Sequence, residues 1–139
     1  LKDGSHIPLH LFLLGPDVKP PKAPVELAKR MGCNAVSMGQ SGWIEGAGII
    51  GPLRDGYASA KAILGDRRVT AALVIMTAEA VVKFGLPAAS FTSIRFHRMD
   101  ASGDTGADTL LSSAGTMVQG HSNDIKTVLH KPGAPQPQT

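Results

Sequence analysis

The stretch DGYASAKAILGDRRVTAALVIMTAEAVVKFGLP, residues 55–87, predicts two consecutive helices. Asp55 is a suitable N-cap for the first helix, and Gly65-Asp66 can end it and cap the second. The second segment, Val69–Phe84, is apolar on nearly every side, and a helix of this kind is normally buried. Gly85 then favours a left-handed end to that helix. We therefore expect one central helix that is buried against a sheet or against other helices.

The segments around this stretch alternate between strand and helix patterns, which predicts an α/β fold. We expect a two-layer sandwich with a mostly antiparallel sheet and the central buried helix. The glycine-rich segment 39–56 is expected to form a loop, and residues 110–129 a loose helix with a final strand. Further elements are expected as strands at Ile7–Leu14 and Cys33–Met38, a helix from Pro24 to Met31, and a half-exposed strand at Phe91–Arg98.

Length and composition predict a single α/β domain over residues 1–130 and a mobile, proline-rich tail over residues 131–139. The acidic segment 100–109 is expected to be a flexible turn. Because the chain starts at Leu1, we expect that natural N-terminal residues precede it.

Charge and composition argue against nucleic-acid and membrane partners. The formal net charge is +3 and the pI is about 9.3, but only Arg67 and Arg68 are adjacent basic residues, and no aromatic series accompanies them. The longest apolar runs are too short or too interrupted to span a bilayer, and no signal peptide is visible. One cysteine, Cys33, cannot pair within the chain, which favours a reducing, cytoplasmic location. A buried, unreactive thiol is the favoured interpretation of Cys33.

The segment GAGIIG, residues 46–51, matches a dinucleotide-binding pattern only formally. Such a loop needs a helix N-terminus directly after it, and residues 52–55 intervene. We interpret it as a tightly turned loop in which Trp43 can line a pocket at a subunit boundary. Arg67 and Arg68 fall in the first turn of the predicted buried helix, which is an unfavourable place for cations. They are therefore candidates for binding an anion or a second subunit, with a solvated turn as the alternative.

Three histidines are candidate site residues. His6 and His10 are four residues apart, but Pro8 between them indicates an extended chain, and no HExxH motif is present. We therefore expect no metal site. His97 with Asp100 can form an oriented acid, or His97 can be a partly exposed strand residue. His121 with Asp124 is interpreted as part of a polar turn.

Three blocks of this sequence, taken together, resemble the formaldehyde-activating enzyme family. The blocks are HIPLHLFLLGP, then residues 55–87, then FTSIRFHRMDASGD, and they cover about half of the chain in the order found in that family. Two departures accompany the resemblance. The strand histidines are shifted relative to Gly15-Pro16, and the segment between Pro16 and Asp55 is shorter than the family's.

The resemblance implies that the protein condenses formaldehyde with a reduced pterin, tetrahydromethanopterin, which is the substrate. It also implies self-association as a pentamer, with the ligand bound between subunits. A histidine general acid would protonate the carbinol hydroxyl so that it leaves as water. His10, His6 and His97 are the candidates for this role, and Trp43, Arg67 and Arg68 are candidate substrate contacts. The alternative is a non-catalytic oligomeric module that binds a small ligand or has a structural role.

Overall fold

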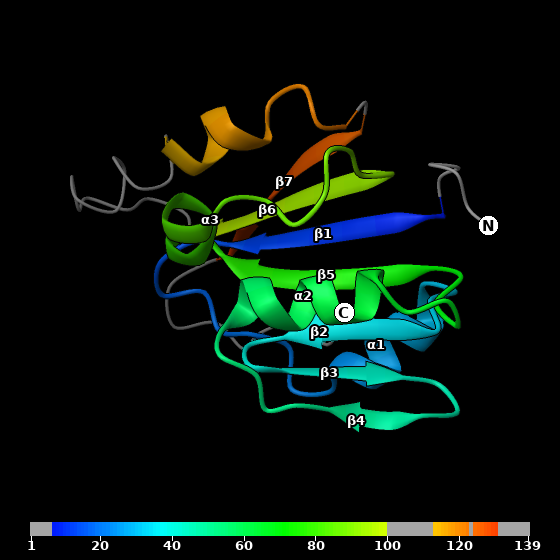
Figure 1. The fold of residues 1–139 in the computed structure, drawn as a ribbon. Helices are drawn as coiled ribbons and strands as arrows, with labels where there is room; N and C mark the ends of the chain where they lie inside the picture. Colours follow the sequence, from blue (N-terminus) through cyan, green and yellow to red (C-terminus); the bar gives the residue numbers. More distant parts are fainter. Residues whose placement is uncertain (1–6, 100–112, 123, 131–139) are drawn as a thin grey trace.

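The computed structural model describes residues 7–99, 113–122 and 124–130, which form a seven-stranded mixed sheet with helices packed on it (Figure 1). The helices are α1 (Pro24–Arg30), α2 (Gly56–Leu64) and α3 (Ala78–Phe84), with a further helix at residues 113–118. The strands are β1 (Leu9–Leu14), β2 (Ala35–Met38), β3 (Ser41–Ile44), β4 (Gly48–Ile50), β5 (Ala72–Thr77), β6 (Ser93–Met99) and β7 (Ile125–His130).

The strand order is β4-β3-β2-β5-β1-β6-β7. Four of the neighbouring pairs are parallel, namely β2 with β5, β5 with β1, β1 with β6, and β6 with β7. The antiparallel pairs are β2 with β3 and β3 with β4. The predicted α/β class is confirmed, but the prediction of a mostly antiparallel sheet is wrong. The strands β1 and β5 are buried on both faces, a pattern typical of parallel sheets covered by helices.

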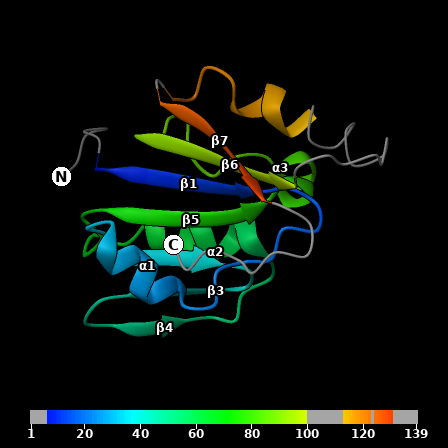
Figure 2. The same cartoon turned by 180° about the vertical axis from the view of Figure 1, so that it is seen from behind.

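Helices lie on both faces of the sheet, so the predicted two-layer arrangement is not confirmed. We call the face covered by α2, α3 and residues 113–118 the front face, and the face covered by α1 the rear face (Figures 1 and 2). Strand β1 alternates between them. Leu11 and Leu13 belong to the front core cluster, and Phe12 and Leu14 belong to the rear cluster.

The predicted central helix Val69–Phe84 is wrong, because residues 72–77 form β5 and the helix α3 begins only at Ala78. A segment that is apolar on every side fits a central parallel strand as well as a buried helix, and periodicity cannot separate the two. The hydroxyl of Thr77 accepts a hydrogen bond of 3.0 Å from the Ala80 amide and caps α3. Ala72 is fully buried, as expected, but in a strand.

Several local predictions are confirmed. Asp55 caps α2, since its Oδ1 atom accepts a 2.8 Å hydrogen bond from the Ala58 amide. Gly85 ends α3 with a φ of 90°. Helix α1 begins at Pro24, and the expected opening, second, later and final strands appear as β1, β2, β6 and β7.

The glycine-rich segment contains the antiparallel hairpin of β3 and β4, so the prediction of a loop over residues 39–56 is wrong for these two strands. A Cβ atom at Gly42 would stand 2.8 Å from Ile63 Cγ2, so this glycine lets β3 approach α2 closely. No helix follows residues 46–51 directly, as expected. The predicted turn at 100–109 and the predicted tail at 131–139 lie outside the described residues. In the described ranges, no helix is long and apolar enough to cross a membrane.

Candidate functional site

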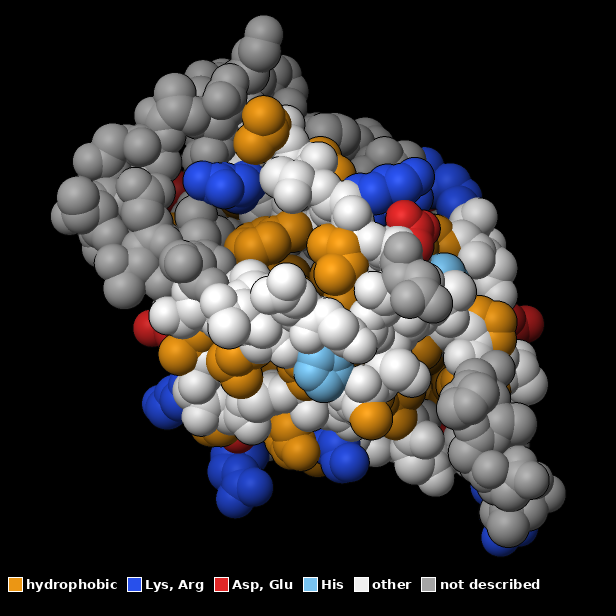
Figure 3. All heavy atoms as spheres, turned by 90° about the horizontal axis from the view of Figure 1, so that it is seen from above, with side chains coloured by type: hydrophobic (Ala, Val, Ile, Leu, Met, Phe, Trp, Pro, Cys, Tyr) orange, Lys and Arg blue, Asp and Glu red, His pale blue; other side chains and the backbone are white. Residues whose placement is uncertain are grey.

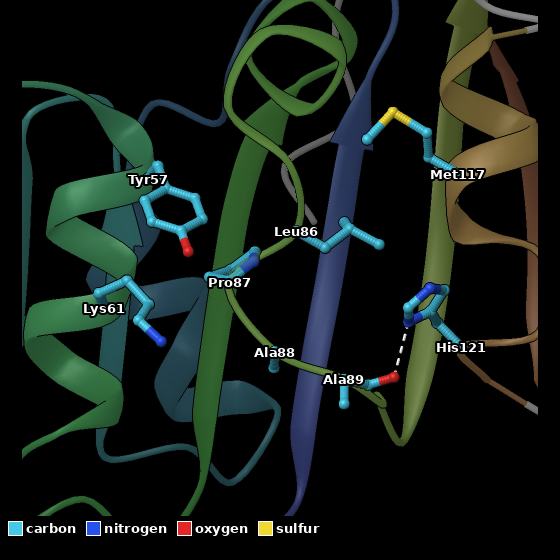
Figure 4. Close-up of a pocket in the computed structure, with 8 residues that line it drawn as sticks. All are labelled: Tyr57, Lys61, Leu86, Pro87, Ala88, Ala89, Met117 and His121. Carbon is cyan, nitrogen blue, oxygen red and sulfur yellow. Dashed lines mark hydrogen bonds between the residues drawn. The ribbon is translucent and has the colours of Figure 1, made fainter.

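A pocket of about 520 Å³ opens on the front face of the sheet. We call it the front pocket. Its walls come from α2, from the segment that leads from α3 to β6, and from the region of residues 113–121 (Figure 4). The lining residues are Tyr57, Lys61, Leu86, Pro87, Ala88, Ala89, Met117 and His121.

Helix α2 supplies one polar wall. Tyr57 and Lys61 are four residues apart and therefore lie on the same face of the helix. Ser59, Ala60 and Ile63 on other sides of α2 are buried, which fixes the rotation of the helix. The Tyr57 hydroxyl points toward Pro87, and the Lys61 side chain lies beside Tyr57 on the same side of the segment that carries Pro87 (Figure 4).

His121 supplies the opposite polar wall. Its Nδ1 atom is 2.6 Å from the carbonyl oxygen of Ala89, and because a carbonyl can only accept, Nδ1 carries the proton. In the neutral ring, Nε2 is therefore the nitrogen with a free electron pair. The carbonyl of His121 also accepts a 2.7 Å hydrogen bond from the Phe91 amide. These two bonds hold residue 121 against the segment that leads into β6.

The floor of the pocket is apolar. Leu86 and Met117 are partly buried and pack against the front core cluster, and Ala88 packs against it beside them. A cation, a hydroxyl and an imidazole thus surround an apolar surface. This combination suits a ligand with a hydrophobic body and an anionic or hydrogen-bonding group.

A second polar feature lies on the rear face, at the carboxyl end of β6. His97 is 7% exposed, and its Nδ1 atom is 3.0 Å from Nε2 of His130 on β7. We call these two residues the imidazole pair. The ring of His97 also lies 4.8 Å from that of Phe12, and its Nε2 atom is buried without a hydrogen-bond partner. Burial, followed by the nearby His130 and Arg95, lowers the pKa of His97 to about 4.

His10 lies on β1 and accepts or donates a 2.7 Å hydrogen bond between Nδ1 and the Ser93 hydroxyl. Burial and the charge of Arg95 lower its pKa, and Asp124 opposes that shift. His10 is in register with Ser93, four residues before His97 on β6, so about 13 Å of strand separates the two histidines. The structure therefore does not bring His10 and His97 together. His6 and Asp100 lie outside the described residues.

The predicted substrate contacts do not line the front pocket. Trp43 on β3 packs on the rear cluster, with the Lys29 ammonium 5.7 Å from its ring centroid. Arg67 and Arg68 lie in the turn before β5, so their placement in a helical first turn is wrong. Arg68 is exposed and forms a 2.6 Å ion pair with Asp66, which lowers the pKa of that carboxyl to about 2.

Cys33 is buried, as predicted, and burial raises the pKa of its thiol. Within the described ranges, no three His, Cys, Asp or Glu residues are grouped as metal ligands. Seen from above, the Lys and Arg side chains lie in separate groups with hydrophobic and uncharged surface between them (Figure 3).

The three polar residues of the front pocket, Tyr57, Lys61 and His121, were not predicted as site residues from the sequence. The spacing of Tyr57 and Lys61 was a usable signal, because it places both on one face of a helix whose cap was recognised. His121 was expected in a polar turn, and it does follow the helix of residues 113–118. No local pattern indicates that this turn faces α2.

Comparison with known proteins adds no relative: no protein-family model matches the sequence, and no curated protein or solved structure matches it either.

Proposed function

We propose that this protein binds a small amphipathic anion in the front pocket. The observation that carries the proposal is the convergence of Lys61, Tyr57 and His121 around an apolar floor in a cavity of about 520 Å³. Cavities of roughly 300–1,000 Å³ are typical of small-molecule sites. This function corresponds to the ligand-binding alternative considered from the sequence.

The chemistry of the walls defines the ligand class. Leu86, Pro87 and Met117 offer surface for a flat hydrocarbon or heterocyclic body. The ammonium group of Lys61 attracts a carboxylate, sulfonate or phosphate, and the Tyr57 hydroxyl can donate a hydrogen bond to the same group. His121 faces the other end of the ligand.

The aromatic anion 8-anilinonaphthalene-1-sulfonate provides a direct test. We expect saturable binding, detected by probe fluorescence, to the folded chain. Lys61→Gln should weaken binding by about 10- to 100-fold, because a hydrogen bond to a charged group contributes about 1.5–3 kcal/mol. N-Phenyl-1-naphthylamine, a neutral probe of similar size, should bind with little dependence on Lys61.

The matched control is Lys22→Gln, which makes the same charge change on an exposed residue outside the pocket. It should leave the affinity for the anionic probe unchanged. A second pocket variant, Met117→Asp, should weaken both probes because it places a carboxylate on the apolar floor. Equal affinities in Lys61→Gln, Met117→Asp and the unmodified chain would rule out binding at this site.

Formaldehyde-activating chemistry stays a prediction from the sequence. The candidate acids His10 and His97 lie on the rear face, opposite the front pocket, so a ligand in that pocket does not reach them. The assay is the disappearance of formaldehyde in the presence of tetrahydromethanopterin. If His10 or His97 is the general acid, its replacement by Ala should lower the rate about 10²- to 10⁴-fold. Equal rates in the unmodified, His10→Ala and His97→Ala proteins would exclude both residues from that role.

A further inference from the structure

Strand β7 is the last strand on one side of the sheet in the described part of the chain (Figures 1 and 2). In the described part of the chain, it pairs with β6 on one side and with no strand on the other. It is six residues long, whereas β4 at the opposite edge has three. An open strand edge is a template for pairing with another strand.

The direction of the backbone groups of β7 follows from one hydrogen bond. The Ile94 amide donates to the Asp124 carbonyl at 2.9 Å, while Ile94 is in register with Ile125. Backbone groups alternate along a strand, so the even-numbered residues of β7 bond to β6. The N–H and C=O groups of Ile125, Thr127 and Leu129 are therefore directed away from the sheet.

The side chains at these positions are also unusual for an edge. Ile125 is 42% exposed and Leu129 is 58% exposed. Both are odd-numbered and therefore lie on the same face of the strand, the face that carries Ile94. The residues whose backbone groups are directed outward, Ile125, Thr127 and Leu129, therefore include both residues with exposed apolar side chains.

We infer that β7 is the self-association surface of this protein, and that two copies pair antiparallel through it about a two-fold axis at Thr127. Antiparallel hydrogen bonds require outward-directed residues to stand opposite one another. With the axis at Thr127, that residue faces its own counterpart, and Ile125 faces Leu129 of the second copy. This register engages all three outward residues of each strand, giving about six hydrogen bonds.

The same register explains the exposed side chains. It brings Ile125 of one copy against Leu129 of the other, twice, on one face of the joined sheet. On the other face Lys126 stands opposite Val128, so no two like charges face each other directly. A register shift of two residues in either direction places Thr127 opposite one of the exposed apolar side chains and leaves neither of them with an apolar partner.

Sedimentation of the full chain over a wide concentration range tests this surface. We expect a dimer that dissociates on dilution, and loss of that dimer in Thr127→Pro. The Thr127 amide points outward, so proline removes a contact between copies and leaves the hydrogen bonds to β6 in place. Far-ultraviolet circular dichroism should confirm that the variant is folded. Ile49→Ser, at the exposed position on the other edge, should leave the dimer unchanged.

A cross-linking variant tests the register without depending on the proline change. Thr127→Cys in a Cys33→Ala background should form a disulfide between copies under mild oxidation, because facing residues lie about 5.5 Å apart between Cα atoms. Ile49→Cys in the same background should not. A monomer at every concentration, a dimer that survives Thr127→Pro, or equal cross-linking at both positions would overturn the proposal.

Discussion

At the scale of single residues, His97 shows how burial changes the meaning of a sequence candidate. From the sequence it is a candidate general acid, a group that should titrate near neutral pH, or a partly exposed strand residue. In the structure it is buried against Phe12 and His130, and its pKa is lowered to about 4. Because its pKa is lower in the folded chain than in the unfolded chain, the ring is uncharged near neutral pH and binds a proton less readily when the chain is folded.

This shift makes stability depend on pH. Above about pH 6.5, the ordinary pKa of histidine, His97 is neutral in both states and costs no stability. Between about pH 6.5 and 4 the unfolded chain binds a proton that the folded chain does not, so the free energy of unfolding falls as the pH falls. The loss is at most about 3 kcal/mol, because one pKa unit is about 1.4 kcal/mol.

Urea unfolding followed by the fluorescence of Trp43, at a series of pH values, measures this loss. His97→Gln should flatten the dependence on pH between about 6.5 and 4. The control His121→Gln removes an imidazole from outside the buried pair and should keep most of the dependence. An identical pH dependence in His97→Gln and in the unmodified protein would contradict the assignment.

At the scale of secondary-structure elements, the sequence pattern did not predict the boundary between strand β5 and helix α3. Residues 69–84 were expected as one helix, but the chain is extended to Thr77 and becomes helical only at Ala78. The tertiary environment decides this, because β5 pairs in parallel with β1 and β2 and is buried on both faces.

Substitution of Thr77 distinguishes the observed strand and helix from the predicted continuous helix over residues 69–84. As the N-cap of α3 it accepts a hydrogen bond from the Ala80 amide, so Thr77→Ala should lower the free energy of unfolding by about 1 kcal/mol. In the interior of a continuous helix the same change would be neutral or stabilising, because alanine is the better helix former. Thr70→Ala, in the exposed turn before β5, is the control and should have a small effect in urea unfolding.

The elements that could be predicted are those whose signals are local. Asp55 caps the N-terminus of α2 and Gly65 its C-terminus, Pro24 begins α1, and Gly85 ends α3. Each of these effects depends only on backbone conformation and hydrogen bonds within a few residues. Strand direction has no such local signal. The hairpin of β3 and β4 could not be predicted because glycine is depleted in strands. Gly42 lies in β3 because a side chain at this position would collide with Ile63 of α2.

At the scale of the whole molecule, the front pocket depends on contacts that no short sequence pattern contains. Tyr57 and His121 come from elements far apart in the chain, and the segment of Leu86–Ala89 connects α3 to β6 between them. The six residues predicted for the site lie in predicted strands, in the glycine-rich loop and in the first turn of the predicted helix. In the described part of the chain, none of them lines this pocket.

The separation of the pocket from the imidazole pair has a consequence for ligand binding. The sheet lies between the two features, with the pocket on the front face and the pair on the rear face. A ligand in the pocket should therefore leave the surroundings of His97 and His130 unchanged.

A titration of the ¹⁵N-labelled protein with 2-naphthoate, followed by amide and histidine-ring chemical shifts, tests the central claim most directly. We predict saturable shifts at Tyr57, Lys61, Ala88, Met117 and His121, with the rings of the imidazole pair unaffected. Shifts confined to the rear face around His10, Arg95 and His97, or no saturable shift at any concentration, would contradict the claim that this protein binds a small amphipathic anion in the front pocket.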